Sequence, residues 1–218
     1  MRIVTDHRLA DWSPDHVHPK GAATDSTRHA GFNKKLFGVI PQPRLLDLGC
    51  AGGGLVASII EDGGSAVGVD GSDCNAKSGR AEWSVIPDRL FTADLTYPFM
   101  FEGDDWQPVT FNVVTAWEVL EHIPEGRIRA VMDNVRRHLE LGGLFICSIS
   151  TERDHWDGYD YHVTVHSRDW WVGVLAVLGW REDEAMFKYF DPDWVRGPAN
   201  GMMSFPLVLR DAGSASFG

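Results

Sequence analysis

A glycine-rich stretch followed by a carboxylate is the part of the chain whose residue types and spacing indicate ligand binding. The stretch is Asp47-Leu48-Gly49-Cys50-Ala51-Gly52-Gly53-Gly54, and Asp70 follows it. Glycines in a turn after a strand allow backbone N–H groups and a ligand to approach each other closely. A carboxylate about twenty residues downstream, at the end of the next strand, can accept both hydroxyls of a ribose. The pattern indicates a ligand that contains adenosine.

Two classes of adenosine ligand are compatible with this arrangement. Gly52-Gly53-Gly54-Leu55-Val56-Ala57 matches the dinucleotide pattern G-x-G-x-x-A, but such patterns normally begin directly after an apolar strand, whereas here Asp47 precedes the turn. A carboxylate is unfavourable beside a pyrophosphate and favourable beside an ammonium and a sulfonium, because opposite charges attract strongly in a partly dry site. The sequence therefore favours S-adenosylmethionine. A nicotinamide-dependent oxidoreductase and a non-catalytic cofactor-binding protein are the alternatives.

With these residues the chain resembles the class I S-adenosylmethionine-dependent methyltransferase family, whose first motif is acid-x-Gly-x-Gly-x-Gly. Ala51 replaces the middle glycine. The resemblance covers roughly residues 44–150 and includes Phe91–Leu95, Trp117–Pro124 and Leu141–Phe145. It implies that Asp70 holds the ribose, that Asp94 and Leu95 hold the adenine edge, and that the glycine turn and Trp117 hold the methionine portion. The cofactor-binding residues expected from it are Asp47, Gly49, Cys50, Ala51, Gly53, Asp70, Gly71, Asp94, Leu95 and Trp117.

The segment Glu118-x-x-Glu121-His122 indicates a second ligand. Ligands at i, i+3 and i+4 lie on one helical face and could bind a divalent ion such as Mg²⁺ or Mn²⁺. Here the sequence is similar to the quinone-biosynthesis O-methyltransferases and the small-RNA 3′-end methyltransferases, in which this segment is associated with a metal. The latter have a later histidine before an arginine, and His162 precedes Arg168 in the same way. The alternative is that Glu121 and His122 only begin the next helix and shape the acceptor pocket.

Methyl transfer to an oxygen requires the acceptor hydroxyl to lose its proton, which a histidine or a metal ion can assist. His122 and His162 are the predicted catalytic residues, and His155 and His166 are weaker candidates. Aromatic residues near His162 are predicted to form an acceptor wall from Trp156, Tyr159 and Tyr161, whereas Trp170 and Trp171 are predicted to pack in the core.

Alternating strand and helix patterns are expected to position these residues. Strands are predicted at 44–48, 65–69, 89–92, 111–116 and 144–149, helices at 32–39, 53–61, 125–140 and 168–178, and two further strands at Glu184–Phe190 and Met202–Leu209. This order predicts an α/β fold with a doubly wound, mainly parallel, Rossmann-like seven-stranded sheet and an antiparallel edge strand. Residues 1–40 are expected to form an irregular arm or lid with a short helix, and residues 41–218 the S-adenosylmethionine-binding domain.

Composition limits the partners and the location. The 218 residues carry a formal net charge of -11, which makes nucleic acid and anionic lipid unlikely partners and favours a small-molecule acceptor. The 3 cysteines contain no CxxC pair, so neither a disulfide framework nor a thiolate zinc site is expected. The sequence has neither an apolar run long enough for a membrane span nor a secretory signal, so a cytoplasmic location is expected.

Overall fold

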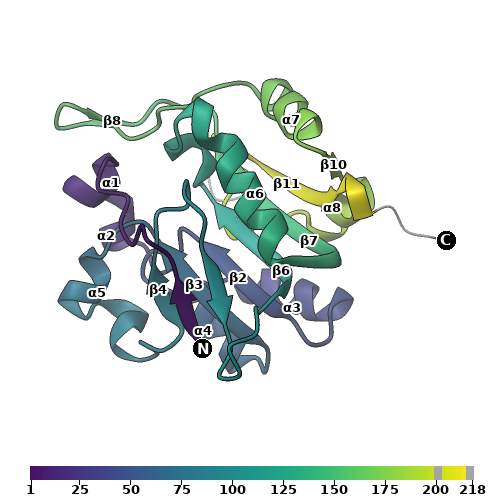
Figure 1. Cartoon of the computed structure of the whole chain (residues 1–218). Coiled ribbons are helices and arrows are strands. Elements are labelled where there is room, and N and C mark those ends of the chain that lie inside the picture. Colours follow the sequence, from purple (N-terminus) through teal and green to yellow (C-terminus); the bar gives the residue numbers. More distant parts are fainter. Residues whose placement is uncertain (199–202, 215–218) are drawn as a thin grey trace.

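The computed structural model describes residues 1–198 and 203–214. Its centre is a seven-stranded sheet in the order β10-β11-β7-β6-β2-β3-β4 (Figure 1). The five strands from β7 to β4 pair in parallel, and β11 runs antiparallel to both β7 and β10. This confirms the predicted fold class. The strands are β2 (Arg44–Leu48), β3 (Ser65–Asp70), β4 (Leu90–Thr92), β6 (Phe111–Trp117), β7 (Leu139–Ser150), β10 (Trp180–Glu182) and β11 (Ser204–Asp211).

Helices cover both faces of this sheet. Adjacent strand residues point to opposite faces, so Leu45 packs with α3, α4 and α8 in one core cluster while Leu46 packs with α6 and α7 in the other. These helices are α3 (Ala30–Val39), α4 (Gly54–Glu61), α6 (Ile128–His138), α7 (Arg168–Val177) and α8 (Glu184–Phe190), and α5 (Cys74–Ser78) follows β3. Trp171 is buried in the core as predicted, and Trp170 is partly buried against it. No helix in the described part of the chain is long and apolar enough to cross a membrane.

The predicted strand Glu184–Phe190 is wrong, because this segment forms the helix α8. The Asp183 side chain accepts a hydrogen bond from the N–H of Met186 and so caps a helix, and helical spacing brings Phe190 into the core beside Phe32. The seventh strand is instead β10, a short segment with a buried Trp180. The predicted strand Met202–Leu209 corresponds to β11, which begins at Ser204, and Met202 lies outside the described residues.

Several boundaries also differ from the prediction. The helix predicted at 125–140 is divided into the 3₁₀ turn η3 (Glu125–Arg127) and α6, and Leu139 already belongs to β7. Gly142 and Gly143 lie inside β7, at the irregular start of its pairing with β6. Further 3₁₀ turns within the described residues are η1 (Ala81–Ser84), η2 (Leu120–His122) and η5 (Ala212–Ser214).

The N-terminal segment has more regular structure than the sequence indicates. Strand β1 (Arg2–Val4) pairs antiparallel with β5 (Met100–Glu102), and two single-turn helices follow, α1 (Pro14–Val17) and α2 (Gly21–Thr24). In Figure 1, α1 lies near the hairpin of β8 (His155–Trp156) and β9 (Tyr159–Asp160). The polar composition hides this structure, because single-turn helices and a three-residue strand show no sustained hydrophobic period. Whether residues 1–40 and 41–218 act as separate units stays a prediction.

Candidate active site

A cavity of about 290 Å³ lies where β2, β3 and β6 end, and the N-terminal segment forms its other wall. This is the edge of a doubly wound sheet where ligands bind. Seven of the residues expected to bind the cofactor line the cavity, namely Gly49, Ala51, Asp70, Gly71, Asp94, Leu95 and Trp117. Asp47, Cys50 and Gly53 do not line it. The Cys50 side chain is buried instead against Gly68, and its thiol has a strongly raised pKa because of this burial.

The backbone of the turn after β2 packs closely against the segment that follows β6. Gly49 has a φ of +71°, and a Cβ atom there would lie 2.5 Å from a methyl group of Val119. The Ala51 N–H donates to Asp70 Oδ2 and the Ser72 N–H donates to Asp70 Oδ1, each at 2.8 Å. Burial raises the pKa of Asp70, and these two N–H donors oppose that rise. The turn therefore holds a carboxylate at a fixed position in the cavity wall.

Asp47 lies behind this turn and has a perturbed pKa. Burial raises the pKa of Asp47 to about 7, against the hydrogen bond that Thr115 Oγ1 donates at 2.7 Å. The charges of Asp25 and Asp70 raise it further. Such an accumulation of carboxylates is stabilised by a cation and destabilised by an anion.

Asp94 contacts the N-terminal segment. Trp12 Nε1 donates to Asp94 Oδ2 at 2.6 Å, while Thr96 donates from its N–H and hydroxyl to Asp94 Oδ1 at 2.8 and 2.7 Å. The N–H of Asp94 donates to the carbonyl of His7. Trp12 is not among the predicted site residues, because an isolated tryptophan in a polar segment without periodicity carries no positional signal.

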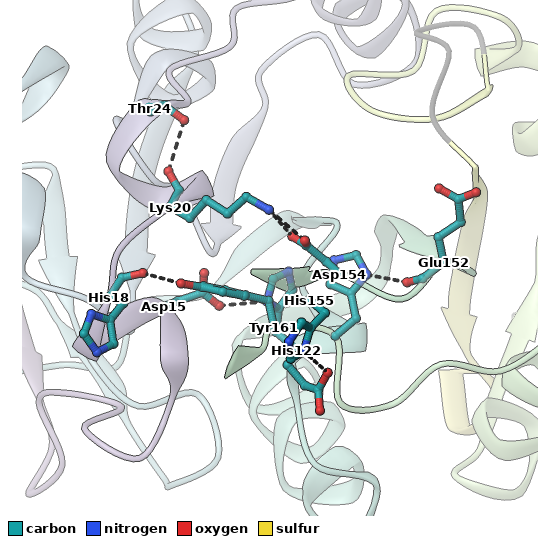
Figure 2. A network of polar contacts seen from close by, with 11 residues as sticks. Asp15, His18, Lys20, Thr24, His122, Glu152, Asp154, His155 and Tyr161 are labelled. Atoms are coloured by element: carbon teal, nitrogen blue, oxygen red, sulfur yellow. Dashed lines mark hydrogen bonds and ion pairs between the residues drawn. The ribbon is translucent and has the colours of Figure 1, made fainter. Parts of the chain in front are cut away.

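Three polar contacts join the N-terminal segment to the opposite wall (Figure 2). Asp15 Oδ2 lies 2.7 Å from His122 Nδ1, and Lys20 Nζ donates to Asp154 at 2.7 and 3.0 Å. The buried Tyr161 donates from its hydroxyl to the carbonyl of His18 at 2.7 Å. The segment from α1 to α2 thus closes the cavity like a lid.

The predicted histidine and carboxylate cluster is partly assembled. Potential ligand atoms of Glu121, His122 and His162 all lie within 4.8 Å of one another. The Glu121 carboxyl accepts from the Ser150 N–H at 2.7 Å through Oε1, whereas Oε2 is buried without a partner among the described residues. Burial raises the pKa of Glu121 to about 7. Glu118 lines the cavity but is not a member of the cluster, and its buried Oε1 likewise has no partner in the described chain.

The two catalytic candidates have opposite pKa shifts. Burial lowers the pKa of His122, but the hydrogen bond and charge of Asp15 act against it together with the charges of Glu121 and Asp154, and the pKa is raised. Burial lowers the pKa of His162, and its Nδ1 lies 2.6 Å from the Glu152 carbonyl oxygen. A carbonyl oxygen can only accept, so Nδ1 carries the proton and Nε2 of the neutral ring has the lone pair.

The weaker candidates lie elsewhere. His155 pairs with Asp160 in the exposed hairpin, and His166 contacts Glu125 and stacks on Trp170. Neither lines the cavity. Of the predicted acceptor wall, Tyr161 lines the cavity, whereas Trp156 and Tyr159 are exposed in the hairpin and do not line it.

The fold and this cavity define a doubly wound α/β protein with a ligand-sized cavity at the carboxyl edge of its sheet, and comparison with known proteins identifies its family. A family model described as a methyltransferase domain matches residues 14–193. The chain therefore belongs to the class I S-adenosylmethionine-dependent methyltransferases, as its motifs predicted. This assignment does not support the nicotinamide-dependent alternative.

Among curated proteins, the chain is 27% identical over 140 residues to a ubiquinone biosynthesis O-methyltransferase of Idiomarina loihiensis, covering 63% of this chain and 50% of that protein. It is 32% identical over 109 residues to the mitochondrial ubiquinone biosynthesis O-methyltransferase of Schizosaccharomyces pombe, covering 49% of this chain and 38% of that protein. The chain thus spans about half the length, or less, of these curated relatives.

Solved structures share the fold at low identity. A 1,6-didemethyltoxoflavin-N1-methyltransferase of Burkholderia thailandensis, with 1,6-didemethyltoxoflavin and S-adenosylhomocysteine bound, superposes with a TM-score of 0.61 at 16% identity, covering 93% of this chain and 86% of that one. The CcbJ methyltransferase of Streptomyces caelestis gives a TM-score of 0.59 at 15% identity, covering 96% of this chain and 100% of that one. These similarities support the fold.

Proposed function

We propose that this chain transfers the methyl group of S-adenosylmethionine to a hydroxyl oxygen of a small molecule. The observation that carries the proposal is that Asp70 and the glycine turn line the same cavity as His122 and His162. S-adenosylmethionine supplies a methyl group activated by its attachment to a sulfonium. The residues of the chain would then bind the cofactor and the acceptor, align them for the transfer and remove the proton of the acceptor hydroxyl. Such alignment accounts for most of the catalysis expected of a methyltransferase.

The residue roles follow from the contacts in the cavity. Asp70 would accept the ribose hydroxyls, because its carboxylate is held by the N–H groups of Ala51 and Ser72 and each oxygen retains a lone pair. Asp94 and Leu95 would contact the adenine, and Gly49, Ala51 and Trp117 the methionine portion. Asp47, although outside the lining, would favour the cationic cofactor through its charge.

The acceptor proton has a candidate destination in His162. Its pKa is lowered by burial and its Nδ1–H points at the Glu152 carbonyl, so Nε2 can accept a proton at neutral pH. His122, paired with Asp15, would orient the acceptor by donating from its other ring nitrogen.

A divalent metal is the second way to activate the hydroxyl. The orphaned buried oxygens of Glu118 and Glu121 and the close approach of Glu121, His122 and His162 fit a cation. Glu121, His122 and His162 would hold Mg²⁺ or Mn²⁺, with Glu118 nearby, and the ion would lower the pKa of a bound hydroxyl. His162 cannot be both ligand and base, because Nε2 alone is available, so metal binding and base catalysis by His162 are alternatives.

Three observations favour a small, uncharged or cationic acceptor modified on oxygen. The curated relatives are named as O-methyltransferases of ubiquinone biosynthesis. Most charged residues around the cavity are acidic, among them Asp15, Asp154 and Glu118. The net charge of -11 disfavours nucleic acid.

The test combines binding and turnover. We expect calorimetry to detect S-adenosylhomocysteine binding, and a panel of phenols and other small alcohols to yield S-adenosylhomocysteine together with an O-methylated product identified by mass spectrometry. No binding of S-adenosylhomocysteine would overturn the proposal. Turnover that survives replacement of both His122 and His162 would overturn their catalytic roles, and N-methylated products alone would overturn the choice of oxygen.

A further inference from the structure

The methionine portion of the proposed cofactor carries a carboxylate, and the wall around the glycine turn is acidic. Asp25, Asp47 and Asp70 all contribute negative charge there. A carboxylate entering this region of low polarity needs a cationic partner. Among the described residues that line the cavity, Lys20 and Arg196 are the two with a permanent positive charge.

Lys20 lies at the histidine end of the cavity. Its Nζ contacts Asp154 and lies 5.5 Å from the centre of the Tyr161 ring (Figure 2). The charge of Asp154 in turn acts on both His122 and His162. Lys20 therefore lies at the end of the cavity where the acceptor is proposed to bind.

Arg196 lies at the glycine-turn end. Its Nη2 is 2.5 Å from Asp25 Oδ1, and the carbonyl of Asp25 accepts from the Gly52 N–H at 3.0 Å. A Cβ atom at Gly52 would lie 2.5 Å from that carbonyl oxygen, so Asp25 packs directly on the turn. One residue thus connects the guanidinium of Arg196 to the backbone where the methionine portion is proposed to bind.

The chain before Arg196 is anchored. Trp194 and Val195 are 1% and 4% exposed, and the Trp194 ring packs against Phe187 and Phe190 with centroids 5.3 and 6.1 Å apart. An anchored backbone reduces the side-chain and loop entropy that ligand binding has to overcome.

We propose that Arg196 binds the carboxylate of the methionine portion of S-adenosylmethionine while it remains close to Asp25. A planar guanidinium has five N–H donors and can bind two carboxylates at once, which an ammonium group does less specifically. This inference rests on the proposed function. It assigns a cofactor contact to the segment after α8, where the sequence showed no cofactor motif.

The experiment compares two ligands by calorimetry on the full chain. S-adenosylhomocysteine carries the amino-acid carboxylate, and 5′-methylthioadenosine lacks it but retains the adenosine. For Arg196→Met we expect the Kd of S-adenosylhomocysteine to rise about tenfold or more, as for loss of a charged hydrogen bond, and the Kd of 5′-methylthioadenosine to stay within about twofold. Arg196→Lys is expected to restore part of the loss. Lys20→Met, which removes a charge from the other end of the same cavity together with the lid contact to Asp154, is expected to change both Kd values by the same factor.

Each outcome is decisive. Equal losses for both ligands, no loss for either, or a selective loss in Lys20→Met instead would overturn the role of Arg196. Wild-type protein that binds neither ligand would overturn the proposed function itself. If Arg196→Met does not fold, as judged by its thermal transition, the ratio of the two Kd values in Arg196→Lys decides, because a carboxylate contact changes that ratio and a structural defect does not.

Discussion

Asp15 and His122 are joined by a 2.7 Å contact, although one lies in α1 near the N-terminus and the other in η2 after β6. Together with the Lys20–Asp154 pair and the Tyr161–His18 hydrogen bond, this contact fastens the lid to the wall that carries the histidines. The lid therefore contributes to the cavity as a structural wall, and the state of the histidine cluster depends on its position.

Removing Asp15 is predicted to loosen the lid. In Asp15→Ala, the contact with His122 is lost, and we expect amide hydrogen exchange in residues 12–20 to accelerate about tenfold, as for loss of roughly 1.4 kcal/mol. Asp11→Ala is the matched control, because Asp11 is exposed and lies in the same segment. Equal exchange in wild-type and Asp15→Ala protein would show that the contact does not hold the lid.

Asp70→Asn is predicted to weaken the binding of every ligand that contains adenosine. The amide that replaces the carboxylate loses charge and one acceptor, so the Kd values of S-adenosylhomocysteine and of 5′-methylthioadenosine should both rise about tenfold or more by calorimetry. This pattern differs from the selective loss expected for Arg196→Met. Asp73→Asn, nearby but outside the cavity lining, should leave both Kd values unchanged. Unchanged affinity in Asp70→Asn would contradict the ribose contact.

The cofactor side of the cavity was largely predictable from sequence, because parallel strands end at a common edge. Asp70 and Trp117 end apolar strands and Asp94 closely follows another, so strand assignment alone brings them together. Residues that reach the cavity from the lid, such as Trp12 and Asp15, depend on tertiary contacts of a segment without hydrophobic period.

The same limit explains the error at α8 and the missed residue Arg196. Aromatic residues in Glu184–Phe190 favour a strand, but the Asp183 cap and burial of Phe190 select a helix. Arg196 lines the cavity from the segment that follows this helix, where no motif marks it.

A metal, if bound, is predicted to depend on Glu121. Titration with Mn²⁺ followed by electron paramagnetic resonance should detect binding in the wild type, and Glu121→Gln should weaken it, because a neutral amide is a poorer ligand for a hard cation. Glu125→Gln is the control, since Glu125 lies outside the cluster and contacts His166. Wild-type protein that does not bind Mn²⁺ would leave base catalysis by His162 as the route to deprotonation. Equal binding in both variants would instead locate the ion elsewhere.

His138 is predicted to make stability depend on pH in acid. Its ring is 1% exposed and stacks on Phe99 at 4.6 Å, its Nδ1 donates to the carbonyl of Asn134, and its Nε2 is buried without a partner among the described residues. Burial lowers the pKa of His138 to about 4. The unfolded chain takes up this proton near pH 6.5 and the folded chain only near pH 4. The contribution of the neutral ring to the free energy of unfolding is therefore fully present above about pH 6.5 and is lost as the pH falls toward 4. This loss is about 3 kcal/mol at most.

The measurement compares wild type with His138→Leu, because other groups act in the opposite direction. The pKa values of Asp47 and Glu121 are raised to about 7 by burial, so protonation of these groups stabilises the fold as the pH falls. Both groups are present in both proteins, so their contributions cancel when the free energy of unfolding of one protein is subtracted from that of the other. We expect urea unfolding at pH 7 and pH 4.5 to show that the difference in free energy of unfolding moves in favour of His138→Leu in acid. Any loss of packing adds an offset that does not depend on pH. Parallel curves would mean that the ring takes up its proton at the same pH in the folded and in the unfolded chain, which would contradict the lowered pKa of His138.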